Sequence, residues 1–145
     1  MILSLMACTE QPKQAQTVSS SEVVPTVESE HCCTNGTYQI SITETLLYND
    51  SVGSDWTKTY TCDGQSVTNG KQWTVPLNNA KTVKINVTFT ENDKWPDIGK
   101  GYLSVLLADG FEASTIITVT ENKGRYIGNT AQWKVTIRTK LIQKS

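Results

Sequence analysis

The sequence predicts an all-β protein whose folded part is an antiparallel β-sandwich of about seven or eight strands. Three observations support this prediction. Apolar residues alternate with polar ones from residue 37 onward, which is typical of strands that bury one face. Thr, Val, Ile, Asn and Lys dominate this region, and clusters rich in Asp, Asn and Gly separate the alternating runs. The long Leu/Ala/Glu/Lys stretches that are typical of helices are absent.

The individual strands follow from this alternation. In TYQISIT (37–43) and KTVKINVTFTE (81–91), every second residue is apolar or aromatic. WTKTYTC (56–62) follows the same pattern, except that Lys58 interrupts its apolar face. The predicted strands cover residues 37–43, 56–62, 71–75, 81–91, 101–109, 114–121 and 132–142.

Size and charge exclude several classes of function. A chain of 145 residues is consistent with one domain that has a real core. The formal net charge is −1, so no strong field attracts nucleic acid, and we expect no nucleic-acid partner. His31 is the only histidine and lies beside the N-terminal linker, which leaves a Ser or Cys nucleophile without its usual base. We therefore expect no catalytic residues and no enzyme.

Residues 1–7 resemble the end of a bacterial lipoprotein signal. Leu5-Met6-Ala7-Cys8 has the Leu, the small residue and the Cys of a lipobox. The resemblance implies that Cys8 is lipidated and anchors the protein to a membrane of the bacterial cell envelope, at the outer membrane or cell surface. A basic start and an apolar run of about 7–15 residues are missing, so we expect the signal to begin upstream. The alternative is a Cys that follows a few apolar residues by chance.

A flexible linker is predicted for residues 8–30. This segment mixes Gln, Ser, Thr, Glu and Pro with few large apolar residues, so it cannot bury enough surface to offset its ordering entropy. The disordered tether would hold the sandwich domain, residues 31–145, away from the membrane.

The cysteines are consistent with an exported protein, in which disulfides persist. If the first two strands form a hairpin centred near Leu47 and Tyr48, Cys33 falls roughly opposite Cys62. We therefore predict a Cys33–Cys62 disulfide, with Cys32–Cys62 as the alternative. The Cys and His spacing does not indicate a zinc site.

Acidic loops are the candidate metal site. Asp50 and Asp55 lie between the first two long strands, and Glu91, Asp93 and Asp97 follow the strand 81–91. Calcium takes six to eight oxygen ligands, and loop carboxylates and carbonyls supply them. If the two loops share one end of the sandwich, calcium is the expected cofactor. The alternative is that these residues only serve turns, where Asp and Asn are common.

A family resemblance supports the calcium prediction. NDSVGSDW, and later VKINVTFTENDKWPDIGKGYLSVLL, resemble two calcium loops of a C2 domain. By position, the resemblance assigns Asp50 and Asp55 to the first loop. It assigns Glu91, Asp93 and Asp97 to the second loop, with Ile98-Gly99 as the turn. The sandwich is accordingly expected to be C2-like or immunoglobulin-like.

Exposed loop residues could contact a ligand. Trp95 precedes a proline in the second acidic loop, and Arg125 and Tyr126 lie between the last two strands. Three functions therefore stay open. The first is a non-catalytic envelope lipoprotein with a binding domain for an envelope protein, glycan or lipid. The second is a calcium-dependent C2-like lipid- or ligand-binding module, and the third is a structural envelope domain without a small ligand.

Overall fold

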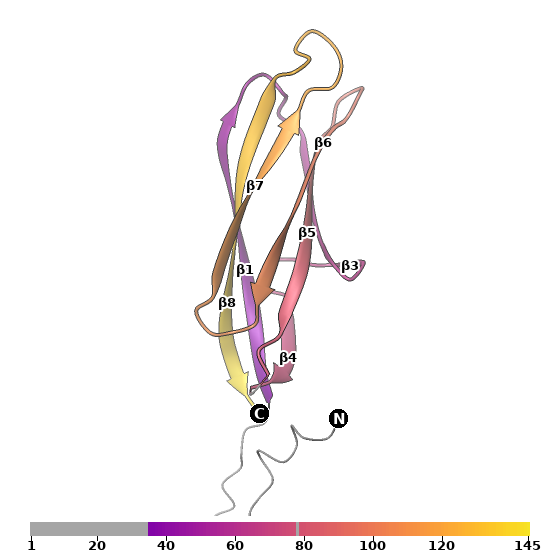
Figure 1. Ribbon diagram of the computed structural model, residues 1–145. Helices are drawn as coiled ribbons and strands as arrows, with labels where there is room; N and C mark the ends of the chain where they lie inside the picture. Colours follow the sequence, from indigo (N-terminus) through magenta and orange to yellow (C-terminus); the bar gives the residue numbers. More distant parts are fainter. Residues whose placement is uncertain (1–34, 78) are drawn as a thin grey trace, which may run out of the picture.

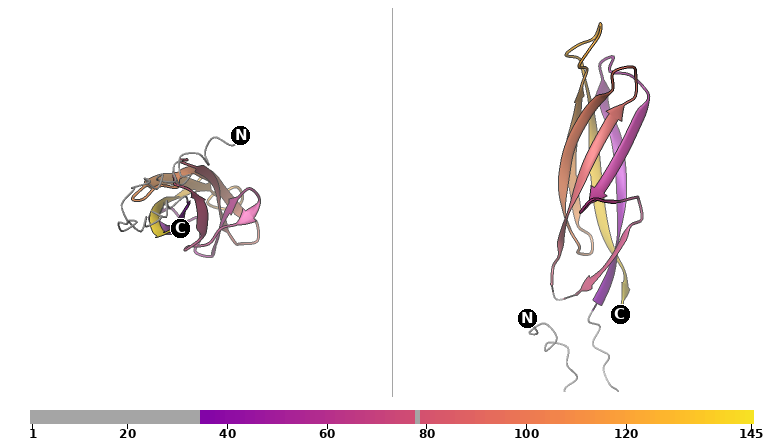
Figure 2. Two further views of the ribbon diagram at one scale, coloured as in Figure 1. Left: turned by 90° about the horizontal axis from the view of Figure 1, so that it is seen from below. Right: turned by 90° about the vertical axis from the view of Figure 1, so that its right-hand side faces the viewer.

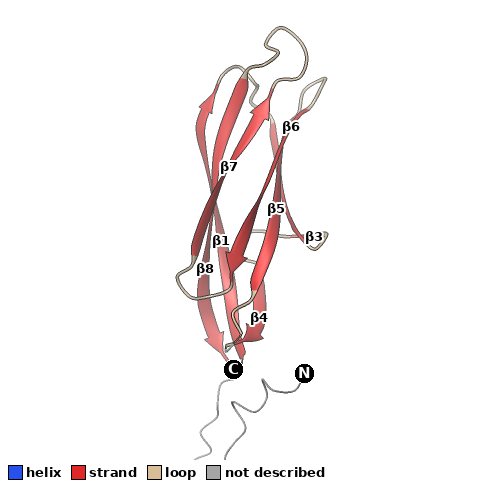
Figure 3. Cartoon of the chain, viewed as in Figure 1, coloured by secondary structure: helices blue, strands red, loops and turns tan. Residues whose placement is uncertain are grey.

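The computed structural model describes residues 35–77 and 79–145. They form two four-stranded antiparallel sheets packed as a sandwich, which confirms the predicted fold class (Figures 1 and 3). No helix in these ranges could span a membrane. The strands are β1 (Asn35–Asn49), β2 (Trp56–Cys62), β3 (Gln65–Ser66), β4 (Gln72–Pro76), β5 (Thr82–Glu91), β6 (Asp97–Leu106), β7 (Glu112–Thr120) and β8 (Thr130–Lys144).

The strand order shows that the predicted hairpin of the first two strands is wrong. One sheet has the order β4-β1-β8-β7 and the other β3-β2-β5-β6, so β1 and β2 belong to different sheets. The connecting loop crosses between the sheets, and Ser51 (φ 57°) and Gly53 (φ 127°) supply its left-handed backbone. The Asn49 side chain accepts a hydrogen bond from the Val52 N–H, which shapes the crossing. β1 pairs with β8 and β4 instead.

The strands run along the long axis of the molecule, and the two ends differ (Figures 1 and 2). Asn35 and Ser145 lie together at one end, where the N–H of each donates to the carbonyl of the other over 3.1 and 2.8 Å. The loops 50–55, 92–96 and 121–129 lie at the opposite end (Figure 1). This second end, called the loop end below, is where the predicted acidic residues gather.

The core confirms the predicted alternation. The inward residues of β5 are all buried, with exposed fractions between 0 and 6%. Lys58, which interrupts the apolar face of β2, also points inward. Its Nζ lies 2.7 Å from Glu44 Oε2 and 3.7 Å from the centre of the Trp133 ring, so both its charge and its stem find partners.

β6 begins earlier than predicted, and Ile98-Gly99 is not a turn. Both residues pair within the β5–β6 ladder. Gly99 is required for packing against β7: a Cβ at this position would lie 2.5 Å from the Thr118 carbonyl oxygen. A Cβ at Gly101 would similarly lie 2.6 Å from Ile117 Cδ1. The glycines therefore allow a close approach of two strands, which a sequence pattern cannot distinguish from a turn.

Candidate functional site

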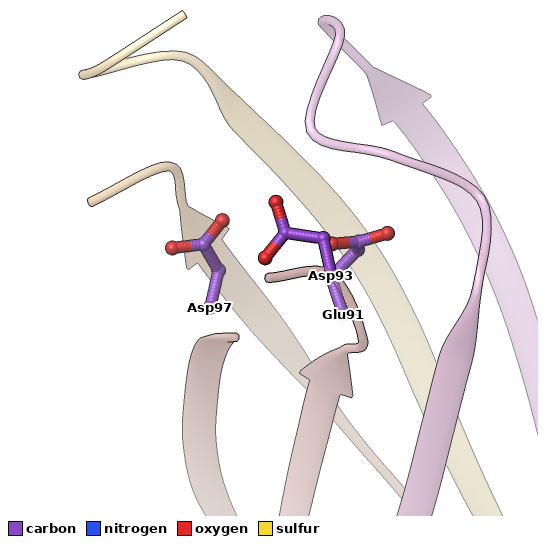
Figure 4. Close-up of side chains that lie close together, drawn as sticks. All are labelled: Glu91, Asp93 and Asp97. Atoms are coloured by element: carbon purple, nitrogen blue, oxygen red, sulfur yellow. The ribbon is translucent and has the colours of Figure 1, made fainter. Parts of the chain in front are cut away.

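Three acidic side chains converge at the loop end. Glu91 is the last residue of β5 and Asp97 the first of β6, and the two are direct partners in the antiparallel ladder. Directly opposed residues project to the same face of a sheet, so both carboxylates point toward the interior. Asp93 lies in the loop between them (Figure 4). One carboxylate oxygen from each of the three lies within 4.8 Å of the others.

Two of these carboxylates are buried without full hydrogen bonding. Asp97 is 0% exposed and Glu91 is 4% exposed. Within the described residues, Glu91 Oε2 and Asp97 Oδ2 have no hydrogen-bond partner. A buried charged oxygen with no partner is costly, and folded proteins rarely leave one in that state. A cation bound between them would supply the partner that both atoms lack.

The remaining oxygens are held by loop backbone. Asp97 Oδ1 accepts the Asn122 N–H at 2.8 Å, and Asp93 Oδ1 accepts the Trp95 N–H at 2.7 Å. Glu91 Oε1 faces the Asp55 N–H at 3.4 Å. Each carboxylate thus uses one oxygen to fix its orientation. The second oxygens of Glu91 and Asp97 are the two buried atoms without a partner.

Glu121 is a fourth acid beside this cluster, outside the group of oxygens within 4.8 Å of one another, and the sequence analysis missed it. It follows β7 directly and is 8% exposed. Burial raises the pKa of its carboxyl, and the charge of Asp97 raises it further. The sequence did contain a signal for Glu121. It continues the alternation of the buried residues Ile117 and Val119, and an acidic residue at such an inward position is uncommon.

Electrostatics make the cluster unfavourable without a counter-charge. Burial is the largest cause that raises the pKa of Glu91, while the hydrogen bond from the Asp55 backbone opposes it. The charges of Asp93, Asp97 and Asp55 raise it further. Like charges that disfavour one another's ionisation indicate a site in which a cation would restore the charged forms.

The loop 50–55, the first predicted calcium loop, contacts the cluster through its backbone. The carboxylates of Asp50 and Asp55 lie outside the cluster. Asp50 and Asp55 are exposed and do not belong to the group of oxygens within 4.8 Å. Asp55 instead uses its N–H toward Glu91, and its carbonyl accepts the Asn92 N–H at 2.7 Å. Gly53 packs directly on the Glu91 carboxylate, so closely that a Cβ there would collide with it. The loop therefore covers the site from one side.

The residues predicted to contact a ligand surround the same end. Trp95 is 44% exposed and Tyr126 is 45% exposed. The Lys94 ammonium lies 4.8 Å from the Trp95 ring, and the Arg125 guanidinium lies 5.6 Å from the Tyr126 ring. Ile127, at 66% exposed, was not predicted and extends this group. Together these side chains form an exposed rim of aromatic, apolar and cationic groups beside the acidic cluster.

The predicted disulfide and lipid anchor fall largely outside the described residues. Cys62 is buried at the end of β2 and forms no disulfide within the described part of the chain. Cys8, Cys32 and Cys33 lie outside it, as does the linker. The hairpin that placed Cys33 opposite Cys62 does not exist, so the pairing stays a prediction without its geometric basis.

Comparison with known proteins gives no match: no family model, curated protein or solved structure is significantly similar to this chain.

Proposed function

We propose that this chain is a non-catalytic, lipid-anchored protein of the bacterial cell envelope whose β-sandwich binds calcium at its loop end. Glu91, Asp93 and Asp97 supply the ligands, and Glu121 adds a negative charge beside them. The observation that carries the proposal is the pair of buried oxygens, Glu91 Oε2 and Asp97 Oδ2, that lack a partner at the centre of an acidic cluster.

The donor set favours calcium over other metals. All three side chains offer hard carboxylate oxygens, which suit calcium and magnesium and not the softer transition metals. Magnesium demands near-ideal octahedral geometry and keeps several waters. Calcium accepts irregular and bidentate carboxylates at a higher coordination number, which fits acids that come from one loop and two strand ends.

The position of the site relative to the proposed anchor supports a binding role. Asn35, where the described chain begins, lies at the end opposite the loops (Figure 1). β1 has 15 residues. At about 3.4 Å per residue, the loop end is roughly 50 Å from Asn35. A lipid on Cys8 would join the domain at the end opposite the calcium site, which leaves the site and its rim free to reach an envelope protein, glycan or lipid.

Calorimetric titration of calcium into chelator-treated protein tests the metal site. We expect one ion per chain, and weaker heat or affinity for magnesium. Glu121→Gln should weaken calcium binding, because it removes a negative charge beside the ligands. Glu112→Gln is the matched control, since Glu112 lies at the other end of β7 in an exposed pair with Arg138. Absence of calcium binding at millimolar concentration would overturn the proposal and leave a structural domain without a small ligand.

A second candidate function is calcium-dependent binding of a lipid or other ligand at the rim. The observation that favours it is the exposure of Trp95, Tyr126 and Ile127 around the acidic cluster, with Lys94 and Arg125 beside the rings. Such amphipathic groups are common in recognition surfaces. Trp95→Ala should then reduce calcium-dependent sedimentation with anionic-lipid vesicles while calcium affinity stays unchanged. Equal sedimentation of both proteins would exclude the rim as the lipid contact.

A further inference from the structure

The sandwich is open along one of its two sides. On one side β6 and β7 pack against each other, whereas on the other side the Cα atoms of β1 and β2 stay more than 8 Å apart. The segment 67–71 crosses this open side after β3, which projects from the sandwich (Figure 1). The Val67 N–H donates to the Tyr60 carbonyl over 2.8 Å, and the Gly70 N–H donates to the Ile40 carbonyl over 3.0 Å. The segment is therefore held to both sheets and forms a wall at the open side.

A cleft of about 490 Å³ lies beside this wall, and we call it the side cleft. Its volume falls within the range that is typical of small-molecule sites. The lining combines an ion pair with two apolar residues, a hydroxyl and an amide: Glu44, Lys58, Ile42, Val67, Thr68 and Asn69. None of these residues belongs to the acidic cluster, so the side cleft is separate from the proposed calcium site.

A polar network occupies inward positions on both sheets beside the side cleft. Glu44 on β1 and Lys58 on β2 lie in the register of inward residues, and Lys58 Nζ donates to Glu44 Oε2 over 2.7 Å. The Tyr60 hydroxyl donates to Glu44 Oε1, and burial raises the pKa of this hydroxyl, so it remains a donor. Apolar residues of similar volume in place of an inward ion pair are often neutral or stabilising. Stability alone therefore does not explain the network.

The network and the wall leave polar groups available to a ligand. The side chains of Lys58 and Glu44 are 23 and 26% exposed. An ammonium group has several N–H donors and a carboxylate has several acceptor sites, so each can bond beyond the pair. Asn69 Oδ1 accepts the Ile42 N–H at 2.7 Å, which fixes the amide and leaves its own N–H groups as donors. The exposed residue Thr68 adds a hydroxyl to the lining.

We propose that the side cleft binds a neutral saccharide. The charges of Glu44 and Lys58 cancel within the cleft, so neither an anion nor a cation is favoured. An apolar ligand would bury these polar groups without partners, which is costly. A sugar hydroxyl both donates and accepts, so it can bond to the neighbouring ammonium and carboxylate at once. The C–H groups of a sugar ring can pack on the apolar side chains of Ile42 and Val67.

NMR titration of the full chain in chelator tests the proposal. The probes are maltotriose, cellotriose and triacetylchitotriose, with trialanine as a neutral-backbone peptide for comparison. We expect at least one saccharide to shift the backbone amide signals of Thr68 and Asn69 in a saturable manner, and trialanine to leave them unchanged. Because no residue of the side cleft belongs to the acidic cluster, this result does not depend on whether the chain binds calcium.

Two variants connect the binding to the side cleft. Glu44→Gln should weaken saccharide binding about tenfold, because it removes a hydrogen bond to a charged group, and Thr68→Val about fivefold, because it removes a neutral one. Thr120→Val is the matched control, since Thr120 is exposed on β7 and lies outside the cleft. Melting curves verify that each variant is folded. The proposal is overturned if none of the three saccharides shifts these signals at millimolar concentration, if trialanine shifts them equally, or if both cleft variants keep the wild-type affinity.

Discussion

Asp93→Asn should stabilise the metal-free protein and, in the same molecule, abolish most of the stabilisation by calcium. The substitution is clean because Asp93 Oδ1 only accepts the Trp95 N–H, a bond that an Asn oxygen can also accept. Asp93 is exposed, so its burial does not change. The perturbation is therefore the removal of one negative charge from the acidic cluster.

The magnitude follows from the separation of the carboxylates. Oxygens of Asp93, Glu91 and Asp97 lie within 4.8 Å of one another. At that distance a pair of like charges costs about 3.5 kcal/mol at an effective dielectric constant near 20, and about 0.9 kcal/mol in water. Asp93 lies at the wet rim, so the lower value applies and the gain is about 1 kcal/mol. For a domain of this size, that raises the melting temperature by about 4 °C.

Calcium should reverse the order of stability of the two proteins. At about a hundredfold excess over the dissociation constant, calcium stabilises the wild type by about 2.7 kcal/mol, since it binds only the folded state. The variant has one charged ligand fewer. If its affinity falls about a hundredfold, the same calcium concentration stabilises it by only about 0.4 kcal/mol. The variant is then the more stable protein without calcium and the less stable one with it.

Scanning calorimetry in chelator and in calcium measures both effects. Asp63→Asn is the control, because Asp63 carries the same charge in the β2–β3 turn and its φ of 50° suits Asn. Because Asp63 lies outside the acidic cluster, Asp63→Asn should leave the melting temperature in chelator near the wild-type value. The rise in melting temperature on adding calcium should also stay at its wild-type size. The reasoning is refuted if Asp93→Asn lowers the metal-free melting temperature, or if the calcium shift persists at its wild-type size.

Three further predictions concern the anchor, the covering loop and pH. With the complete upstream signal present, Cys8→Ser should move the protein from the membrane fraction to the soluble fraction; unchanged partition contradicts the lipid anchor. Gly53→Ala should destabilise the protein by about 2 kcal/mol, because a Cβ collides with Glu91 and the φ of 127° is unfavourable for alanine; an unchanged denaturation midpoint argues against it. The raised carboxyl pKa values of Glu91 and Glu121 mean that the folded metal-free protein binds protons more tightly than the unfolded chain. Its stability should therefore fall as pH rises from the ordinary value of 4.5 through the raised values. Melting temperatures across this range in chelator check the fall, and saturating calcium should remove it.

The sequence predicted those features that depend on local periodicity. Val83, Ile85, Val87 and Phe89 occupy the buried positions that alternation assigned to them. The same periodicity placed Glu91 in the inward register, which is why its carboxylate reaches the cluster. Whether a segment forms a strand, and which of its faces is buried, depends on residues that are neighbours in the chain. Both features can therefore be predicted from a single sequence.

Two kinds of feature could not be predicted in the same way: whether a loop returns to the same sheet or crosses to the other, and which strands then pack together. The segment after Asn49 contains turn residues, which are equally typical of a hairpin and of a crossing to the other sheet. Gly99 was interpreted as a turn residue, although its role is to let β7 approach. Glu121 joins Asp97 only because β6 and β7 meet across the sandwich, a contact that no sequence spacing expresses.

The pairing of Asn35 with Ser145 determines how the domain responds to mechanical force. β1 and β8 are antiparallel neighbours, and their hydrogen bonds lie perpendicular to the strands. Tension between a tether at Asn35 and a ligand held at the loop end acts along the strands, so it loads many bonds of the ladder together. Tension between the two termini would instead open the ladder one bond at a time. A protein held at Asn35 that grips its target by the loops is therefore loaded in its strong direction.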